Sequence, residues 1–223
     1  MELKDIQQDI PAEVFEVLQA AGIKELRPSQ EKAIAAGLLK GTSLLVCTPT
    51  ASGKTLIAEF AATKTILQQK KKALYIVPLK ALASEKHKSF SLRYGRFCKV
   101  ALSIGDTESA DTYLANYDLI VCTAEKLDSL LRHHTPWVAN VGCVVVDEIH
   151  LLNDAHRGPT LEVVLTILKR MLKDVQILGL SATIGNPQEL AAWLNAALVI
   201  DDWRPVPLHK GVYWNGEVRF DAV

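Results

Sequence analysis

The stretch LLVCTPTASGKT, residues 44–55, decides the fold. Its first part, Leu44–Cys47, is a continuous apolar run, which favours a strand buried on both faces. The apolar positions after it, among them Leu56, Phe60 and Leu67, lie at helical spacing and predict a helix from about residue 53 to residue 69. A strand, a tight loop ending in Gly-Lys-Thr and a helix, in this order, predict a phosphate-binding loop.

The chemistry of such a loop explains its residue types. Backbone N–H groups at the helix N-terminus wrap phosphates, and a glycine such as Gly53 lets the backbone approach them. We expect Lys54 to reach the β- and γ-phosphates and the Thr55 hydroxyl to ligate Mg²⁺. Gly-Lys-Thr also occurs by chance on surfaces, but the flanking strand and helix argue against that reading. The predicted nucleotide-binding loop consists of Thr48, Pro49, Thr50, Ala51, Ser52, Gly53, Lys54 and Thr55.

The rest of the chain repeats the alternation of strand and helix. Six further apolar runs lie at 73–77, 100–104, 119–122, 143–146, 177–180 and 198–200. Helical patterns fill most of the gaps, and two helices, at about 11–21 and 29–41, precede the first strand. The alternation predicts an α/β fold, a three-layer domain around a mainly parallel sheet of about seven strands.

A second candidate site follows the run at 143–146, where the sequence reads Asp147-Glu148-Ile149-His150. We expect Asp147 to lie opposite the phosphate loop and to hold Mg²⁺ through water. Glu148 would then lie near the γ-phosphate, where a carboxylate can orient or deprotonate the attacking water. The alternative interpretation is that the two acidic residues only end the strand and have no catalytic role. A chain that already carries a phosphate loop favours the catalytic reading.

Composition excludes several classes of protein. Lys+Arg and Asp+Glu are both 25, so the net charge of zero argues against a general polycation. No apolar run approaches the roughly 20 residues of a membrane span, and the N-terminus lacks a signal peptide. The four cysteines form no CxxC pair and are expected to be buried thiols rather than zinc ligands. We therefore expect a soluble, cytoplasmic protein with no membrane partner.

Taken together, these motifs resemble those of superfamily-2 helicases, whose motor domains are RecA-like. Their phosphate loop need not begin with Gly, which accommodates Thr48, and Asp147 to His150 matches their DExH box. Three more stretches match in family order, at 27–30, 77–82 and 123–128, and Ser181-Ala182-Thr183 matches a fourth motif. The resemblance implies that Gln30 reads the adenine edge. It implies a backbone grip on one nucleic-acid strand by Pro78, Lys80, Thr123 and Lys126. It also implies coupling of hydrolysis to that grip by His150, Ser181 and Thr183.

Four longer stretches resemble the sequences of the Ski-like group, and within it those of archaeal HelQ-like DNA-repair helicases. They lie at 78–86, 157–162, 181–186 and 203–208. The resemblance spans about residues 26–208 and implies ATP and Mg²⁺ as cofactors. It implies a 3'-5' DNA helicase acting on single-stranded or forked DNA. An RNA helicase of the same group, and a nucleic-acid-binding fragment with little activity, are the alternatives. A small-molecule P-loop kinase is a third, against which the Ser-Ala-Thr motif and Gln30 argue.

The family's second RecA-like domain has no counterpart in this sequence, so we expect a fragment of a longer parent chain. Three parts are predicted: N-terminal helices with the glutamine motif at 1–40, a RecA-like motor domain at 41–201, and a connector toward the second domain at 202–223. Residues 203–207, Trp-Arg-Pro-Val-Pro, predict a stiff, extended chain.

Overall fold

The computed structural model describes residues 1–105, 111–133, 135–207 and 211–220. The helices are α1 (Ala12–Ala20), α2 (Pro28–Ala35), α3 (Lys54–Leu67), α4 (Lys80–Tyr94), α5 (Ala124–Arg132), α6 (Gly158–Met171) and α7 (Pro187–Leu194). The strands are β1 (Leu44–Cys47), β2 (Lys72–Val77), β3 (Val100–Ser103), β4 (Leu119–Thr123), β5 (Val141–Val146), β6 (Gln176–Ser181), β7 (Ala197–Ile200), β8 (Gly211–Trp214) and β9 (Glu217–Phe220). Short 3-10 turns include η1 (Leu3–Ile6), η2 (Leu38–Lys40) and η5 (Ile149–Asn153).

Across these described ranges, the large sheet has seven strands in the order β3-β4-β2-β5-β6-β1-β7. Every neighbouring pair is parallel. All seven apolar runs form these strands, with ends that differ from the prediction by at most two residues. The predicted parallel α/β sheet is confirmed.

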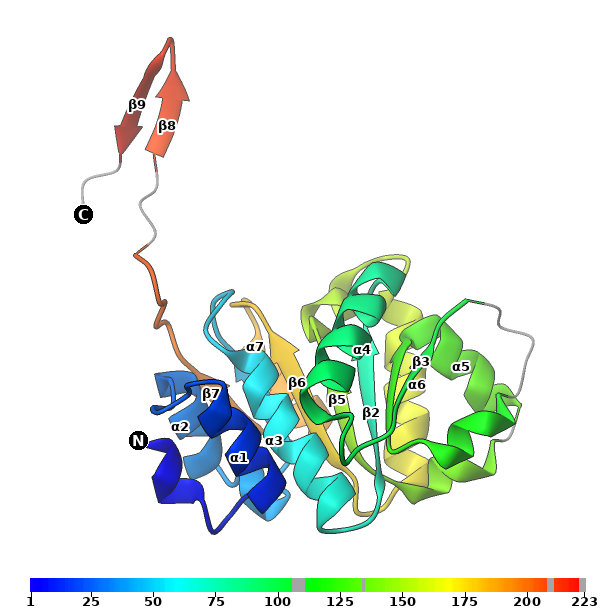
Figure 1. The fold of residues 1–223 in the computed structure, drawn as a ribbon. Helices are drawn as coiled ribbons and strands as arrows, with labels where there is room; N and C mark the ends of the chain where they lie inside the picture. The colour runs from blue at the N-terminus through cyan, green and yellow to red at the C-terminus, as the bar shows by residue number, and fades with distance from the viewer. Residues whose placement is uncertain (106–110, 134, 208–210, 221–223) are drawn as a thin grey trace.

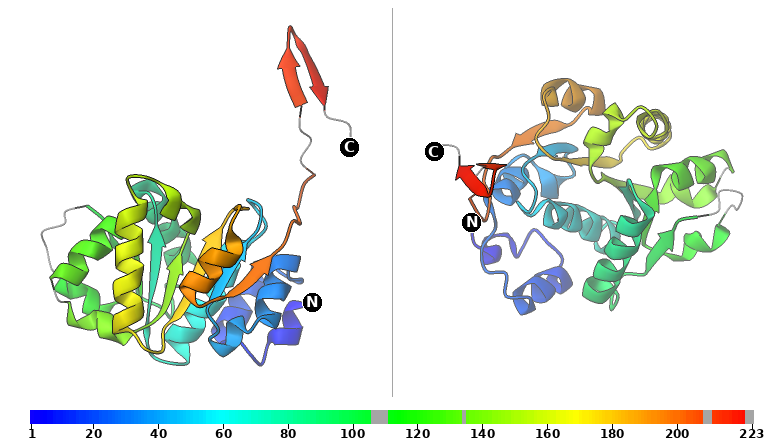
Figure 2. Two further views of the ribbon diagram at one scale, coloured as in Figure 1. Left: turned by 180° about the vertical axis from the view of Figure 1, so that it is seen from behind. Right: turned by 90° about the horizontal axis from the view of Figure 1, so that it is seen from above.

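Successive side chains of each strand point to opposite faces of the sheet and enter two separate cores. In β1, Leu44 and Val46 belong to the core beneath α1–α4, whereas Leu45 belongs to the core beneath α5–α7. Figure 1 shows α1, α3 and α4 in front of the sheet, and the view from behind in Figure 2 shows α6 and α7 covering the other face. The domain therefore has the three predicted layers.

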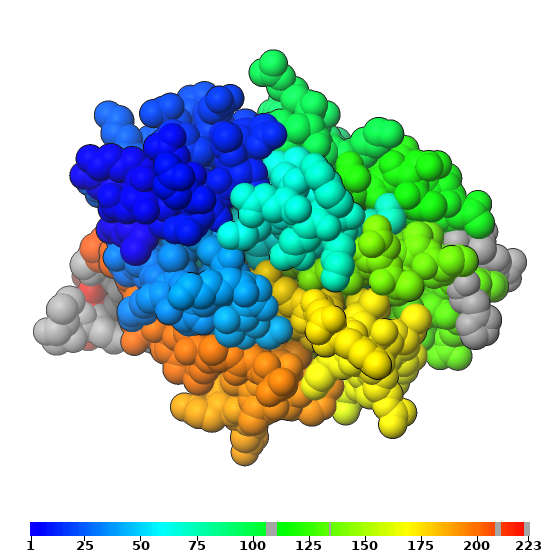
Figure 3. Space-filling model, turned by 90° about the horizontal axis from the view of Figure 1, so that it is seen from below, coloured from blue at the N-terminus to red at the C-terminus, as the bar shows by residue number. Residues whose placement is uncertain are grey.

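The N-terminal segment packs against α3 rather than extending the sheet. The Leu3 N–H donates to the Lys24 carbonyl (2.8 Å), and Lys64 on α3 donates to the Asp9 carbonyl (2.8 Å). Figure 3 shows these first residues, in dark blue, beside the cyan end of α3. The predicted helix at 29–41 is interrupted: α2 ends at Ala35, because Gly37 takes a left-handed conformation (φ 96°) before η2.

The C-terminal segment contains a hairpin that the sequence analysis did not predict. Strands β8 and β9 pair antiparallel across Asn215 and Gly216, both with positive φ. Asn-Gly between two strands is the strongest short-range sequence signal for such a turn. Every described residue of this hairpin is exposed, and Figure 1 shows it apart from the sheet.

All four cysteines are free and buried, as expected. Burial raises the pKa of the Cys98, Cys122 and Cys143 thiols to about 12, which makes them unreactive at neutral pH. Within the described ranges, every helix is too short or too polar to span a lipid bilayer.

Candidate nucleotide and metal site

The candidate residues gather where the parallel strands end. The phosphate loop follows β1, the acidic pair follows β5, and β6 lies between these two strands and ends at Ser181. Ligands in such sheets bind at this carboxyl edge of the strands. The topology therefore brings together motifs that lie about a hundred residues apart in the chain.

The phosphate loop is held by its own polar groups. The hydroxyls of Thr48 and Ser52, both fully buried, hydrogen-bond to each other at 2.7 Å. Gly53 has a φ of 97°, and a Cβ there would lie 2.5 Å from Gln30 Nε2. Ala51 also has a positive φ, of 65°. The positive φ at position 53 favours glycine, and a Cβ there would also require the Gln30 side chain to move.

Lys54 folds over this loop, and its ammonium donates to the carbonyl oxygens of Thr48 (2.7 Å) and Pro49 (3.1 Å). Burial lowers the pKa of Lys54, while the carboxylates of Glu148 and Asp147 act in the opposite direction. The lysine of the loop therefore lies close enough to the acidic pair to interact with it electrostatically.

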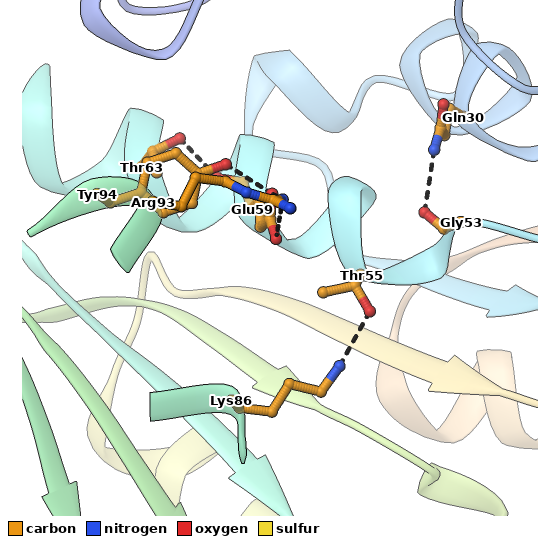
Figure 4. Close-up of polar contacts among 8 residues, drawn as sticks. All are labelled: Gln30, Gly53, Thr55, Glu59, Thr63, Lys86, Arg93 and Tyr94. Atoms are coloured by element: carbon orange, nitrogen blue, oxygen red, sulfur yellow. Dashed lines mark hydrogen bonds and ion pairs between the residues drawn. The ribbon is translucent and has the colours of Figure 1, made fainter. Parts of the chain in front are cut away.

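Gln30 supports the loop from α2. Its Oε1 accepts from the Arg27 N–H (2.8 Å), and its Nε2 donates to the Gly53 carbonyl (3.1 Å), as Figure 4 shows for the second bond. Ser29 donates to the Ser52 carbonyl (3.2 Å), and Arg27 donates to the Ala51 carbonyl. The Gln30 amide thus positions the loop. Because a glutamine amide has two N–H donors and an oxygen with two lone pairs, a second N–H and a second lone pair could also bind the edge of a base.

Asp147 is fixed on both of its oxygens. Oδ1 accepts from the Glu148 N–H (3.1 Å), and Oδ2 accepts from the Tyr75 hydroxyl (3.0 Å). Burial, and then the neighbouring Asp147 charge, raise the pKa of Tyr75 well above its ordinary value, so the hydroxyl remains a donor. The carboxylate consequently has a defined orientation toward the loop.

Lys86 on α4 joins the two predicted metal ligands. Its ammonium donates to Thr55 Oγ1 at 3.0 Å and lies 3.4 Å from Asp147 Oδ2 (the first contact is drawn in Figure 4). Sequence reasoning missed this residue: it was part of the stretch at 78–86 but had no assigned role. One cation thus spans Thr55 and Asp147, the two residues that the sequence predicts as metal ligands.

The donor types also suit Mg²⁺, which prefers hydroxyl, carboxylate and phosphate oxygens. In the part of the chain that the structure describes, no three His, Cys, Asp or Glu side chains form a metal-binding group. A metal held by Thr55 and Asp147 would therefore depend on water and phosphate oxygens for its remaining ligands, as Mg²⁺ commonly does in nucleotide sites.

A cavity of about 740 Å³ opens beside the loop, between α2, α3 and α4. Gln30, Gly53, Thr55 and Lys86 line it, and so does Glu59, a buried acid that sequence reasoning did not single out. Its volume suits a small-molecule ligand.

Glu59 connects α3 to α4. Its carboxylate accepts from Arg93 Nη1 at 2.9 and 2.6 Å and from the Tyr94 hydroxyl at 2.6 Å, as Figure 4 shows. The signal available in the sequence was an acid inside the apolar run at 56–62, where a charge requires a partner.

The predicted coupling residues are only partly connected. Ser181 Oγ lies 3.4 Å from His150 Nδ1, and the same nitrogen lies 3.4 Å from Glu148 Oε2. Glu148 has a positive φ of 54°, an uncommon conformation for a non-glycine residue. Thr183 is exposed in the segment after β6. The chain Glu148–His150–Ser181 thus links the ends of β5 and β6.

The predicted nucleic-acid residues divide into two groups. Pro78 and the exposed Lys80 lie at the junction of β2 and α4. Thr123 is buried, and its hydroxyl accepts from the Lys126 N–H (3.4 Å) at the start of α5. The Lys126 side chain is only 3% exposed and forms an ion pair with Asp111 (2.9 Å). In this structure the Lys126 ammonium is therefore buried and paired with Asp111 rather than exposed.

A parallel sheet between two layers of helices, with a phosphate loop after β1 and an acidic pair after β5, defines a RecA-like P-loop domain. The family model for DEAD/DEAH box helicases matches residues 27–190, and the chain belongs to this family.

The curated proteins similar to this chain include ATP-dependent DNA helicase Hel308 from several organisms. The protein from Pyrococcus horikoshii is 52% identical over 95% of this chain and 29% of its own length. The protein from Methanocaldococcus jannaschii is 55% identical over 93% of this chain and 18% of its own length. The chain therefore spans less than a third of these relatives. The sequence-based placement near archaeal HelQ-like helicases is confirmed.

Solved structures give the same result for the fold. The crystal structure of the DUF1998 helicase MrfA superposes with a TM-score of 0.74 at 30% identity, covering 86% of this chain and 32% of that one. A structure of MrfA bound to DNA gives 0.73 at 29% identity, covering 87% and 30%.

Proposed function

We propose that this chain is the first motor domain of an ATP-dependent DNA helicase and that it binds and hydrolyses ATP·Mg²⁺ at the carboxyl edge of its sheet. One observation carries the proposal: a single cation, the Lys86 ammonium, lies within 3.0 Å of Thr55 Oγ1 and 3.4 Å of Asp147 Oδ2. Thr55 of the phosphate loop and the Asp147 carboxylate thus lie beside one cation position. Hydrolysis of a nucleoside triphosphate requires a metal ion at such a position.

The residues have separate roles in this proposal. Loop N–H groups and Lys54 bind the β- and γ-phosphates, and Thr55 and Asp147 hold Mg²⁺, which neutralises charge on the phosphates. Glu148 accepts a proton from the water that attacks the γ-phosphorus, and the bond to the β-phosphate oxygen breaks to release ADP. We assign the cavity beside Gln30 to the nucleoside.

DNA is the nucleic acid along which we propose that the motor moves. Strands β2 and β4 are neighbours in the sheet, so the starts of α4 and α5 lie at adjacent points of the carboxyl edge. Helix N-termini bind phosphates through backbone N–H groups, and exposed Lys80 adds a charge there. The curated relatives are named as DNA helicases, which favours single-stranded or forked DNA over RNA.

The three parts predicted from the sequence remain part of this proposal. Residues 1–40 contribute the glutamine motif, 41–201 the motor domain and 202–223 a connector. Translocation would need a second RecA-like domain of the same parent chain, because stepping requires two grips that move relative to each other.

Nucleotide binding tests the site directly. Calorimetry with ADP and MgCl₂ should show binding that Lys54→Ala abolishes, whereas Lys88→Ala, an exposed lysine on α4, should leave it unchanged. Equal binding by Lys54→Ala would remove the phosphate loop from the proposal.

The choice of nucleic acid needs the full-length parent. Forked DNA and RNA duplexes of the same sequence, each with ATP, should show unwinding of DNA. Unwinding of RNA alone would favour the RNA helicase, and unwinding of neither would favour a binding module.

A further inference from the structure

Within the described part of the chain, Lys86 contacts both predicted metal ligands, and the proposed hydrolysis does not use it. Its side chain is 16% exposed, and that of Asp147 is 14% exposed, so the contact lies inside the site rather than on the surface. The ammonium also lies 5.6 Å from the centre of the Tyr75 ring, whose hydroxyl donates to Asp147. The ring and the two oxygens together define one position for a cation.

A lysine and a metal ion cannot both occupy that position. Magnesium binds oxygen at roughly 2.1 Å, and an ammonium bonds to the same oxygens at about 3 Å, so each fills the space of the other. Two cations at such a separation also repel in a partly buried site. Any metal that ligates Thr55 therefore has to displace the Lys86 ammonium first.

We propose that Lys86 is a place-holding cation: it neutralises Asp147 and orients Thr55 before nucleotide binds, and it competes with Mg²⁺ for the position between these two residues. This inference rests on the proposed function, since it concerns the same metal site. Lys86 is thus a positioning residue, because it acts through Thr55 and Asp147.

Competition predicts an effect on metal dependence that a purely structural lysine would not have. The relevant quantity is the metal stimulation of ADP binding, defined as the ADP affinity at one fixed, sub-saturating MgCl₂ concentration divided by that in excess EDTA. Removing a competing cation raises the affinity for metal, so this ratio rises when Lys86 is neutralised.

The experiment compares Lys86→Met with Lys88→Met by calorimetry of ADP binding under both conditions. Methionine keeps an unbranched apolar stem and removes the charge. Lys88, on the same helix, is exposed, and its change removes the same charge. We expect the stimulation ratio to rise about fivefold in Lys86→Met and to stay at the wild-type value in Lys88→Met. Lys86→Arg, which keeps the charge, should not raise the ratio.

A second measurement needs no nucleotide. Thermal unfolding in EDTA should occur at a lower temperature in Lys86→Met than in Lys88→Met, because Asp147 loses its cation, and MgCl₂ should narrow that difference. Lys86→Gln provides the same neutral comparison if the methionine variant does not fold.

An unchanged or lower stimulation ratio in the neutral variants would overturn the place-holding role while leaving the nucleotide site intact. If wild-type protein bound no ADP at any magnesium concentration, the proposed function itself would fail, and the place-holder with it. The two failures are therefore distinguishable from the wild-type titration alone.

Discussion

At the scale of single residues, Glu148 separates binding from chemistry. It lies outside the phosphate loop, and its Oε2 is 3.4 Å from His150 Nδ1. We expect Glu148→Gln in the full-length parent to retain ATP affinity and to lose most of its turnover, because an amide of nearly the same shape cannot accept the proton. Steady-state ATPase and nucleotide binding, measured side by side, provide the check. Near-normal turnover would leave Glu148 with a structural role.

Glu59 is a residue whose role is structural support of the site. Removing its carboxylate leaves the Tyr94 hydroxyl without its acceptor, whereas Arg93, at 35% exposed, can turn to water. We expect Glu59→Ala to lower the free energy of unfolding by about 1–3 kcal/mol. Urea denaturation measures this, with Glu162→Ala on the exposed face of α6 as the control. A stability equal to that of the control would mean that the α3–α4 contact contributes little.

At the scale of elements, α4 links the two proposed functions. It begins at Lys80 on the expected DNA side and carries Lys86 at the metal position, six residues or roughly 9 Å along the helix. Its buried positions are few, only Ala83, Phe90 and Tyr94. This is why hydrophobic periodicity did not single it out.

The start of α4 gives the prediction for DNA. Lys80→Ala should weaken binding of single-stranded DNA by a similar factor for every sequence, since a phosphate contact carries no base information. The slope of binding affinity against salt should fall by about one charge. Fluorescence anisotropy with oligonucleotides of different composition tests this, with Lys88→Ala as the matched control. A loss confined to one sequence would indicate base readout.

At the scale of the whole molecule, the 223-residue chain has two complete cores around one sheet, so we expect it to fold by itself. Its ATPase should be slow and barely stimulated by DNA, because the arginines that stabilise the γ-phosphate in such motors come from a second domain. The test is to measure the steady-state ATPase rate of this chain and of the full-length parent, each with and without single-stranded DNA. Strong stimulation of the 223-residue chain alone would contradict the two-domain mechanism.

Local patterns determined most of the fold. A buried parallel strand is a continuous apolar run, and a phosphate loop is a contiguous motif between a strand and a helix, so both can be recognised in a short window of sequence. The seven strands and the grouping of Lys54 with Asp147 follow from such windows together with the rule that ligands bind at the carboxyl edge. Two local signals were misjudged: Gly37 divides the second helix, and Asn215-Gly216 forms a hairpin turn.

Contacts between elements were decided only by the tertiary structure. Lys86 meets Thr55 across 31 positions of the chain, and Arg93 meets Glu59 across 34. Lys126, which was expected to contact nucleic acid, is buried and forms an ion pair with Asp111. A charged side chain looks the same in sequence whether it faces water, a partner or a ligand, because its environment depends on how separate helices pack around the sheet. Sequence by itself therefore determined the domain and its phosphate loop, and packing decided which charges hold the site together.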